Sequence, residues 1–479
     1  MSRRDALRAG VVSTAVIGGV TGAGTMMHAA PAVAAAAATG EGWISVLDHG
    51  AAGDGTTDDT AAIQAALNAA RSANPNKSVY FPAGRIFKVS DQVNATGLSD
   101  SVISGHGATL SLAGSAASVL GGKAVLQLRD CLRVKVLGLT VRDADRLHQY
   151  DGVRVSSSRA IVVDGVHVYN TRFNGIVVYD SPAPRSDDIT ITNCTTEGTR
   201  TGITTNGKDV RIVNNHVAMD WPSTDEGQSG LPWNGTTSNY FDGICVWAGG
   251  DRTVISGNTI TECGQAGVYC QDVTNLVVAD NTVYGCIGRG IEVDGARGVK
   301  LRDDQPDSVV TTRAFGVTIT GNVLRNNDGN INLIFVSDAT VVGNRIENSD
   351  ANHKVTCIAV NRGTNRTVVA ANHARQAHPT SPAVWVHDNA TEVSLAWNEV
   401  HGAVHHAAPA GTVVMRRSAE GLITASGSLK TTGKVIAIGG LGVGNSVVAS
   451  TPGSVVRKME VFSSTGASLG WVPIYNSIG

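Results

Sequence analysis

Between residues 151 and 398 the chain repeats a short pattern, in which a glycine is followed by alternating apolar and polar positions. Val and Ile dominate the first and third positions after the glycine. Because successive side chains of a strand point to opposite faces, the pattern predicts strands with one buried and one exposed face. The glycines that open these strands are Gly152, Gly175, Gly202, Gly243, Gly267 and Gly290.

A second strand, rich in Val and Ile, ends in asparagine and recurs at the same period of about 23 residues. These asparagines are Asn193, Asn215, Asn258, Asn281, Asn322, Asn344, Asn372 and Asn398. Two or three short strands per period, with no helix between them, predict a solenoid whose stacked coils share one apolar interior. We expect each Asn to adopt the bend conformation and to bond its amide to the Asn of the next coil. A β-sandwich would show spacings of about 8–12 residues and Asn-Gly turns, which do not dominate here. The prediction is an all-β, single-stranded right-handed parallel β-helix.

The segment before the repeats predicts a helix over 58–72. Asp58 or Asp59 can cap it, and its apolar positions (Ala62, Ile63, Ala66, Leu67 and Ala70) fall on one face that would plug the end of the solenoid. Residues 46–51 (VLDHGA), 53–60 (GDGTTDDT) and 79–84 (VYFPAG) resemble the entry signature of the pectate-lyase-like superfamily, in its rhamnogalacturonase-like and tailspike-like branch. The resemblance spans about residues 43–400. It implies the β-helix fold, which hosts hydrolases, lyases, epimerases and adhesins.

Three regions are expected along the chain. Residues 1–38 join paired arginines, Arg3 and Arg4, to an uncharged apolar stretch and an alanine-rich run, an arrangement that resembles a twin-arginine export signal. The β-helix is expected over 43–410. Residues 411–479 predict a small β module, for which we expect a capping role; homo-oligomerisation, for example into a trimer, and sugar binding are the alternatives.

Composition narrows the range of partners. With 38 Lys and Arg against 40 Asp and Glu, the chain lacks the basic surface that nucleic acids require. No later segment is apolar for long enough to span a membrane. We therefore expect no membrane association after signal cleavage. The seven cysteines form no CxxC pair and no His cluster has zinc-ligand spacing, so we expect no metal and no cofactor. Cys263 and Cys286 should lie one above the other, as an interior ladder in preference to a disulfide.

Candidate chemistry gathers on the exposed face of the last three glycine-initiated strands. Paired carboxylates can act as the acid and base of glycosidic bond cleavage, and aromatic faces can bind sugar rings. The predicted catalytic residues are Asp242, Asp272, Glu292 and Asp294. The predicted substrate-binding residues are Trp247, Tyr269, Gln271 and Arg289, together with Trp221 and Trp233 in a long aromatic insertion at 218–241. A second insertion covers 296–313.

The sequence therefore predicts a secreted polysaccharide-processing enzyme, a glycoside hydrolase with a polysaccharide substrate. Two alternatives stay open: a lyase acting on uronic-acid polymers, and a non-catalytic glycan-binding or tailspike-like adhesin. Acids on the outer face also serve solubility, so they do not by themselves define a site.

Overall fold

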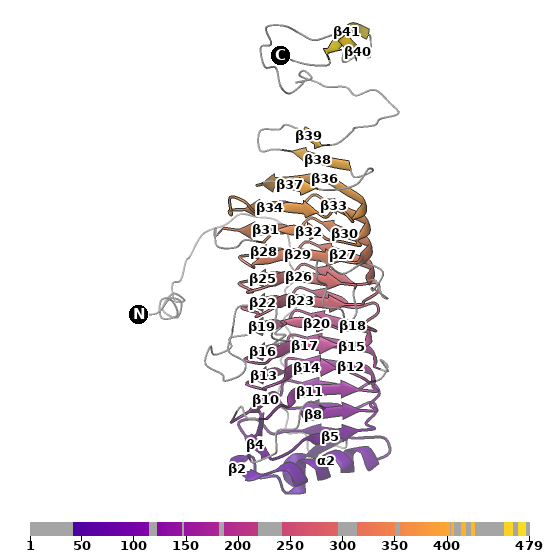
Figure 1. Ribbon diagram of the computed structural model, residues 1–479. Coiled ribbons are helices and arrows are strands. Elements are labelled where there is room, and N and C mark those ends of the chain that lie inside the picture. The colour runs from indigo at the N-terminus through magenta and orange to yellow at the C-terminus, as the bar shows by residue number, and fades with distance from the viewer. Residues whose placement is uncertain are drawn as a thin grey trace, which may run out of the picture. The chain divides into compact units, whose positions relative to one another are not determined.

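The computed structural model describes residues 42–114, 122–145, 148–181, 186–218, 242–295, 314–349, 355–402, 404–406, 413–417, 423–426, 455–462 and 468–475. Over most of this length the chain forms a right-handed parallel β-helix, as predicted (Figure 1). Each full coil adds one strand to each of three parallel stacks.

The first stack contains β5 (Val93–Thr96), β8 (Ala124–Arg129), β11 (Asp151–Ser156), β14 (Asn174–Val178), β17 (Thr201–Thr205), β20 (Ile244–Val246), β23 (Ala266–Gln271), β26 (Arg289–Asp294), β29 (Gly329–Ile334), β32 (Ile358–Val360), β35 (Val384–Val386) and β37 (Val404–His406). The second contains β1 (Trp43–Ser45), β3 (Ser78–Tyr80), β6 (Val102–Ser104), β9 (Lys135–Leu137), β12 (Arg159–Asp164), β15 (Asp187–Thr192), β18 (Lys208–Val213), β21 (Val254–Ser256), β24 (Val277–Ala279), β27 (Ala314–Thr320), β30 (Val336–Val342), β33 (Asn365–Ala370), β36 (Thr391–His401) and β38 (Val413–Arg417). The third contains β2 (Asp54–Asp58), β4 (Ile86–Val89), β7 (Thr109–Leu112), β10 (Thr140–Asp143), β13 (His167–Tyr169), β16 (Thr195–Glu197), β19 (His216–Ala218), β22 (Thr259–Thr261), β25 (Thr282–Tyr284), β28 (Val323–Arg325), β31 (Arg345–Asn348) and β34 (His373–Gln376), and the long strand β36 also pairs with it.

The apolar positions of the repeat fill the interior of the solenoid. Val153 and Val155 of β11 are fully buried in the main core, and so are Ile291 and Val293 of β26. The repeat glycines allow the coils to approach closely. A Cβ atom on Gly243 would lie 2.6 Å from the carbonyl oxygen of the glycine one coil later, so even a methyl group would force neighbouring backbones apart.

Buried asparagines form a ladder at the bend between the second and third stacks, as the pattern predicts. At each step the backbone N–H and the side-chain amide of one Asn donate to the Oδ1 of the next, as between Asn258 and Asn281 (both 2.9 Å). The ladder consists of Asn215, Asn258, Asn281, Asn322, Asn344, Asn372 and Asn398.

Two details of the predicted ladder are wrong. Asn193 is exposed and lies outside it; the neighbouring Cys194 takes the buried position and donates its backbone N–H to Asn215. The left-handed bend is adopted by the residue that precedes each ladder Asn, such as Asn214 (φ 57°) and Asp280 (φ 56°). The ladder Asn itself points inward, because its amide must reach both neighbouring coils.

The helix α2 (Thr60–Ser72) lies across the N-terminal end of the solenoid, next to β5 (Figure 1). It buries Ile63, Ala66, Leu67 and Ala70, so the predicted apolar face is confirmed, although the helix begins two residues later than expected. Asp59 stands at its N-cap without capping it. Its carboxylate instead accepts the backbone N–H groups of the preceding loop, at 2.6 and 3.0 Å. A 3-10 helix, η1 (Val46–His49), precedes it.

Beyond the last full coil, β38 still pairs in parallel with β36, so the second stack continues past the boundary expected at residue 410. Antiparallel pairing follows, between β38 and β39 (Ile423–Ser426) and between β40 (Val455–Phe462) and β41 (Ser468–Tyr475). The predicted export segment, 1–38, lies outside the described residues. Among those described, no helix has the length and apolar character needed to cross a membrane.

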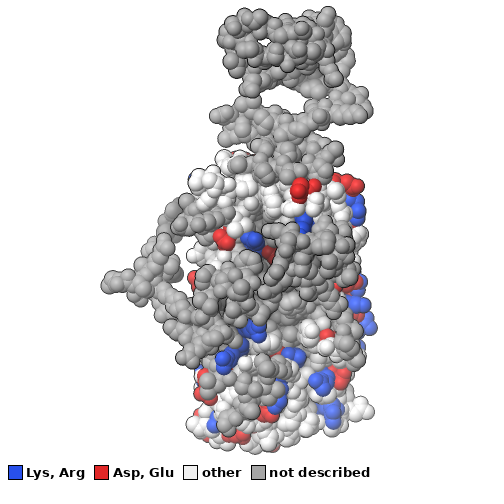
Figure 2. Space-filling view, viewed as in Figure 1, with Lys and Arg blue, Asp and Glu red and all other residues white. Residues whose placement is uncertain are grey.

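All seven cysteines are buried and free, which confirms the ladder interpretation of Cys263 and Cys286 over a disulfide. On the face shown in Figure 2, cationic and anionic side chains of the described residues are interspersed. Several of them form pairs between adjacent coils, such as Arg133 with Asp100 and Arg366 with Asp338. This mixed surface agrees with the near-zero net charge.

Candidate functional site

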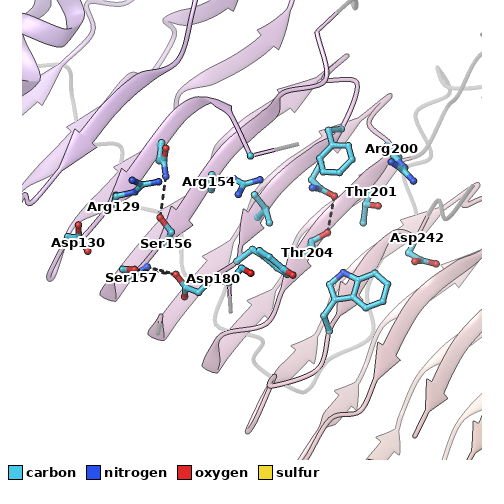
Figure 3. A pocket seen from close by; sticks show the side chains of 18 residues that line it. Arg129, Asp130, Arg154, Ser156, Ser157, Asp180, Arg200, Thr201, Thr204 and Asp242 are labelled. Carbon is cyan, nitrogen blue, oxygen red and sulfur yellow. Dashed lines mark hydrogen bonds between the residues drawn. The ribbon is translucent and has the colours of Figure 1, made fainter. Parts of the chain in front are cut away.

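A groove of about 820 Å³ lies on the outer face of the first stack, over β8 to β20. Figure 3 shows the side chains of successive strands on this face, with Asp130 and Ser157 toward one end and Arg200 and Asp242 toward the other. The strand register creates this arrangement, because equivalent residues of neighbouring coils are direct partners. The volume is within the range of about 300–1,000 Å³ that is common for ligand-binding clefts.

The middle of the groove contains a buried ion pair. Arg154 of β11 donates from Nε and Nη2 to Oδ2 of Asp151, at 2.8 and 2.5 Å. The second oxygen of Asp151 accepts the backbone N–H and side-chain amide of Asn174, at 3.1 and 2.7 Å. Burial raises the pKa of Asp151, and the Arg154 charge opposes that rise. This carboxylate is therefore occupied in positioning Arg154 and Asn174 at the groove wall.

Asp180 also lines the groove but serves the backbone. Its two oxygens accept the N–H groups of Ser157 (2.6 Å) and Ser186 (2.7 Å), and this fixes the bends that end the strands. The groove therefore has fewer chemically available acids than its composition suggests.

The far end of the groove holds Asp242 beside a cation. The guanidinium of Arg200 lies 5.2 Å from the ring centroid of Phe173, at cation–π distance. Asp242 is almost fully buried and accepts the backbone N–H of Ala266 at 3.1 Å. Burial, with a smaller contribution from the charge of Glu292, raises the pKa of Asp242 to about 8, against the opposing effect of Arg200. At neutral pH this carboxyl carries a proton, as a general acid must.

The predicted aromatic patch continues from this end of the groove. Tyr269 of β23 packs in a small apolar cluster outside the main core, and Trp247 contacts it edge-to-face with ring centroids 5.8 Å apart. The amide of Gln271 donates to the phenol oxygen of Tyr269 at 3.0 Å. Burial and the nearby charges of Asp294, Glu292 and Asp242 raise the pKa of Tyr269 well above its ordinary value. The phenol therefore stays protonated.

Glu292 follows Tyr269 in the next coil, as its register partner. Its Oε2 lies 3.5 Å from Nε of Arg289 and accepts the amide of Asn332 at 3.1 Å. Its side chain is 16% exposed, so it remains open to the surface while these two donors orient it. These contacts hold the carboxylate in one orientation at the groove face.

Asp242 and Glu292 form the one carboxylate pair that we single out as reactive. Asp242 lies two coils before Glu292 and three positions earlier along the strand. Coil and residue spacings place their Cα atoms roughly 14 Å apart. The charge of Glu292 contributes to the raised pKa of Asp242, so the two carboxyl groups interact across these coils.

The remaining predicted residues have different positions. Asp294, mostly buried, stands two residues beyond Glu292 and is the register partner of Gln271. Asp272 occupies the left-handed bend that ends β23 (φ 52°), at a position whose equivalents in earlier coils, Asp130 and Ser157, line the groove. Trp221 and Trp233, with both long insertions, lie outside the described residues.

Sequence reasoning placed the site on the last three glycine-initiated strands, whereas the groove extends over earlier coils and meets that patch at Asp242 and Trp247. It missed Arg200 and Phe173, which stand two positions before a repeat glycine, in the turns. Because both residues stand at the same distance before a repeat glycine, the repeat itself could have predicted that they stack on adjacent coils.

These features define a right-handed parallel β-helix protein with a groove along one strand stack. The family model "Right handed beta helix region" matches residues 151–308, in agreement with this fold.

Three similarities give this assignment more detail. The tail spike protein of Salmonella phage epsilon15 is 26% identical over 321 residues, which are 61% of this chain and 27% of that protein, so the chain spans about a quarter of the relative's length. The Dettilon tailspike protein superposes with a TM-score of 0.61 at 21% identity, covering 76% of this chain and 68% of the other. The A-module of the Azotobacter vinelandii mannuronan C-5 epimerase AlgE6 gives 0.55 at 17% identity, covering 78% and 99%.

Proposed function

We propose that the protein is a polysaccharide-processing enzyme, a glycoside hydrolase that uses Asp242 as acid and Glu292 as base on the outer face of the first stack. The observation that carries the proposal is the buried Asp242 carboxyl, whose pKa is raised to about 8, on the same face as the surface-accessible Glu292. Similarity to an epimerase named for mannuronan, a polysaccharide, also supports a polysaccharide substrate.

In this mechanism a sugar chain lies along the groove and across Trp247. Asp242 donates its proton to the glycosidic oxygen as the bond to the leaving sugar breaks. Glu292, oriented by Arg289 and Asn332, removes a proton from the water that attacks the anomeric carbon. Because the Cα atoms of the two acids are roughly 14 Å apart, we propose the wider, inverting arrangement, in which water lies between the two carboxyl groups. Asp272 and Asp294 stay predicted catalytic residues, to which this mechanism assigns no proton transfer.

The test is turnover of a panel of plant, algal and bacterial glycans, with reducing ends and unsaturated ends measured together. Asp242→Asn and Glu292→Gln should each lower kcat at least about 100-fold, since acid–base groups contribute roughly 10²–10⁴. Asp338→Asn, which replaces a partly exposed aspartate on the second stack, is the matched control and should retain full activity. Full turnover by either site variant would exclude the proposed pair. Unsaturated products would identify a lyase instead.

Glycan binding without cleavage is the second candidate. It is favoured by the groove itself, where Asp151 and Asp180 are both occupied by structural contacts. Glycan affinity that is lost in Arg154→Ala, with no product from the wild-type protein, would support this function over the first.

We further propose export by the twin-arginine route, on the pattern of residues 1–38. Replacing both Arg3 and Arg4 by Lys should retain the protein inside the producing cell, and unchanged secretion would contradict this. For residues 411–479 we propose the predicted capping role. The alternative is that this region assembles the protein into a trimer, which a measurement of molar mass in solution would reveal.

A further inference from the structure

Outside the groove, two histidines and a glutamate meet on adjacent coils of the third stack. His373 belongs to β34, whereas Glu399 and His401 belong to the next strand, β36. His373 and Glu399 are direct register partners. Glu399 and His401 are two residues apart on one strand, so their side chains share a face. The coil repeat therefore brings together residues that are 26 positions apart in the sequence.

Potential ligand atoms of the three side chains converge. Nδ1 of His373 lies 3.2 Å from Oε2 of Glu399, and Nε2 of His401 lies 3.2 Å from Oε1. One ligand atom from each residue lies within 4.8 Å of the other two. The imidazole centroids are 5.3 Å apart. Both rings thus face the same carboxylate.

We propose that His373, Glu399 and His401 form a binding site for a divalent transition-metal ion of the Zn²⁺ class. Two imidazole nitrogens and one carboxylate oxygen suit Zn²⁺, Ni²⁺ or Cu²⁺, whereas Ca²⁺ and Mg²⁺ prefer oxygen ligands alone. All three side chains are partly exposed, by 37%, 56% and 41%, so an ion can enter and water can complete its coordination. Sequence spacing did not reveal the site, because its ligands come from different coils.

Three arginines are register partners of the cluster: Arg345 of His373, Arg375 of His401 and Arg417 of Glu399. Their positive charge opposes the binding of a cation. The guanidinium of Arg375 lies 3.5 Å from Glu347, one coil earlier, so its charge is partly compensated there.

A metal at this position would join β34 to β36. Because a preformed three-ligand site is absent from the unfolded chain, binding would stabilise these coils by mass action. This role is independent of the groove on the first stack and of its chemistry.

The third stack also offers a matched control. His167 of β13 lies 3.8 Å from Glu197 of β16, so a histidine and a glutamate again face each other across adjacent coils. Within the described residues no third ligand group joins this pair at metal-binding distance. A two-ligand pair should hold a metal far more weakly.

The experiment is calorimetric titration of ZnCl₂ into chelator-treated full-length protein at pH 7.5. We expect one tightly bound Zn²⁺ per chain and a higher thermal midpoint with the metal. His373→Ala and His401→Ala should each weaken binding at least about tenfold, the lower limit even for residues that only support ligands. His167→Ala should bind as the wild type does.

Three outcomes would overturn the proposal. They are no Zn²⁺ uptake by the wild type, equal affinity in the His373 and His401 variants, and Ca²⁺ binding as tight as Zn²⁺ binding. Circular dichroism of each variant shows whether it is folded, so lost binding is not confused with lost structure.

Discussion

Replacing Asp242 by Asn tests whether its carboxyl is held neutral inside the folded protein. Burial raises its pKa from 3.8 to about 8. Between these values the folded protein keeps a proton that the unfolded chain releases, so the free energy of unfolding falls as pH rises. The contribution is complete below pH 3.8 and is lost as pH approaches 8. At about 1.4 kcal/mol per pH unit, the wild type should lose roughly 2–3 kcal/mol between pH 5 and pH 7 through this group.

An asparagine at this position does not titrate, so the variant does not lose this part of the free energy of unfolding as pH rises. The assay is urea unfolding of both proteins at pH 5, 6 and 7, because their difference cancels every other titrating group. The variant should gain roughly 2–3 kcal/mol relative to the wild type across this window. Asp338→Asn is the control: Arg366 lowers the pKa of Asp338, so that group is ionised in both states throughout. Parallel curves for Asp242→Asn and the wild type would refute a neutral, buried acid.

Three further predictions concern stability and use the same unfolding assay. Asn281→Ala removes a fully buried ladder residue that donates to both neighbouring coils and accepts from Asn258 of the preceding one, and should cost roughly 3–5 kcal/mol. Replacing the exposed Asn193 by Ala should change stability by less than about 0.5 kcal/mol, and equal losses would contradict the ladder. Leu67→Ala opens a cavity beneath the capping helix and should cost about 2–5 kcal/mol; a near-zero change would mean that α2 does not close the core. Arg154→Met leaves the Asp151 carboxylate buried without its cation and should cost roughly 3–5 kcal/mol, much of it restored by adding Asp151→Asn; no restoration would show that the pair is not coupled.

The repeat made most of the fold predictable. Glycine and asparagine recur because neighbouring backbones leave no space for a Cβ and because a buried amide must bond across coils, and both constraints are visible in the sequence. The same period set the register, so the neighbouring positions of Tyr269 and Glu292 followed from counting. The prediction for Asn193 was wrong because an asparagine and a cysteine are adjacent in the sequence at this point, and the sequence does not show which of the two is buried.

The site was less predictable, for two physical reasons. The side-chain directions of Arg200 and Phe173 depend on turns, where strand alternation gives no rule. The proton on Asp242 depends on burial, which arises only when coils stack, so the sequence shows a carboxylate and not its charge. His373, Glu399 and His401 were missed because three ligands from two coils form no local motif.

The most direct test of the account is a crystal structure of the Glu292→Gln variant with an oligosaccharide of the polysaccharide that the wild type processes. The sugar chain should lie along the first stack, with a ring against Trp247 and one glycosidic oxygen within hydrogen-bond distance of the Asp242 carboxyl. Sugar bound only to the second or third stack, or with no glycosidic oxygen near Asp242, would contradict it.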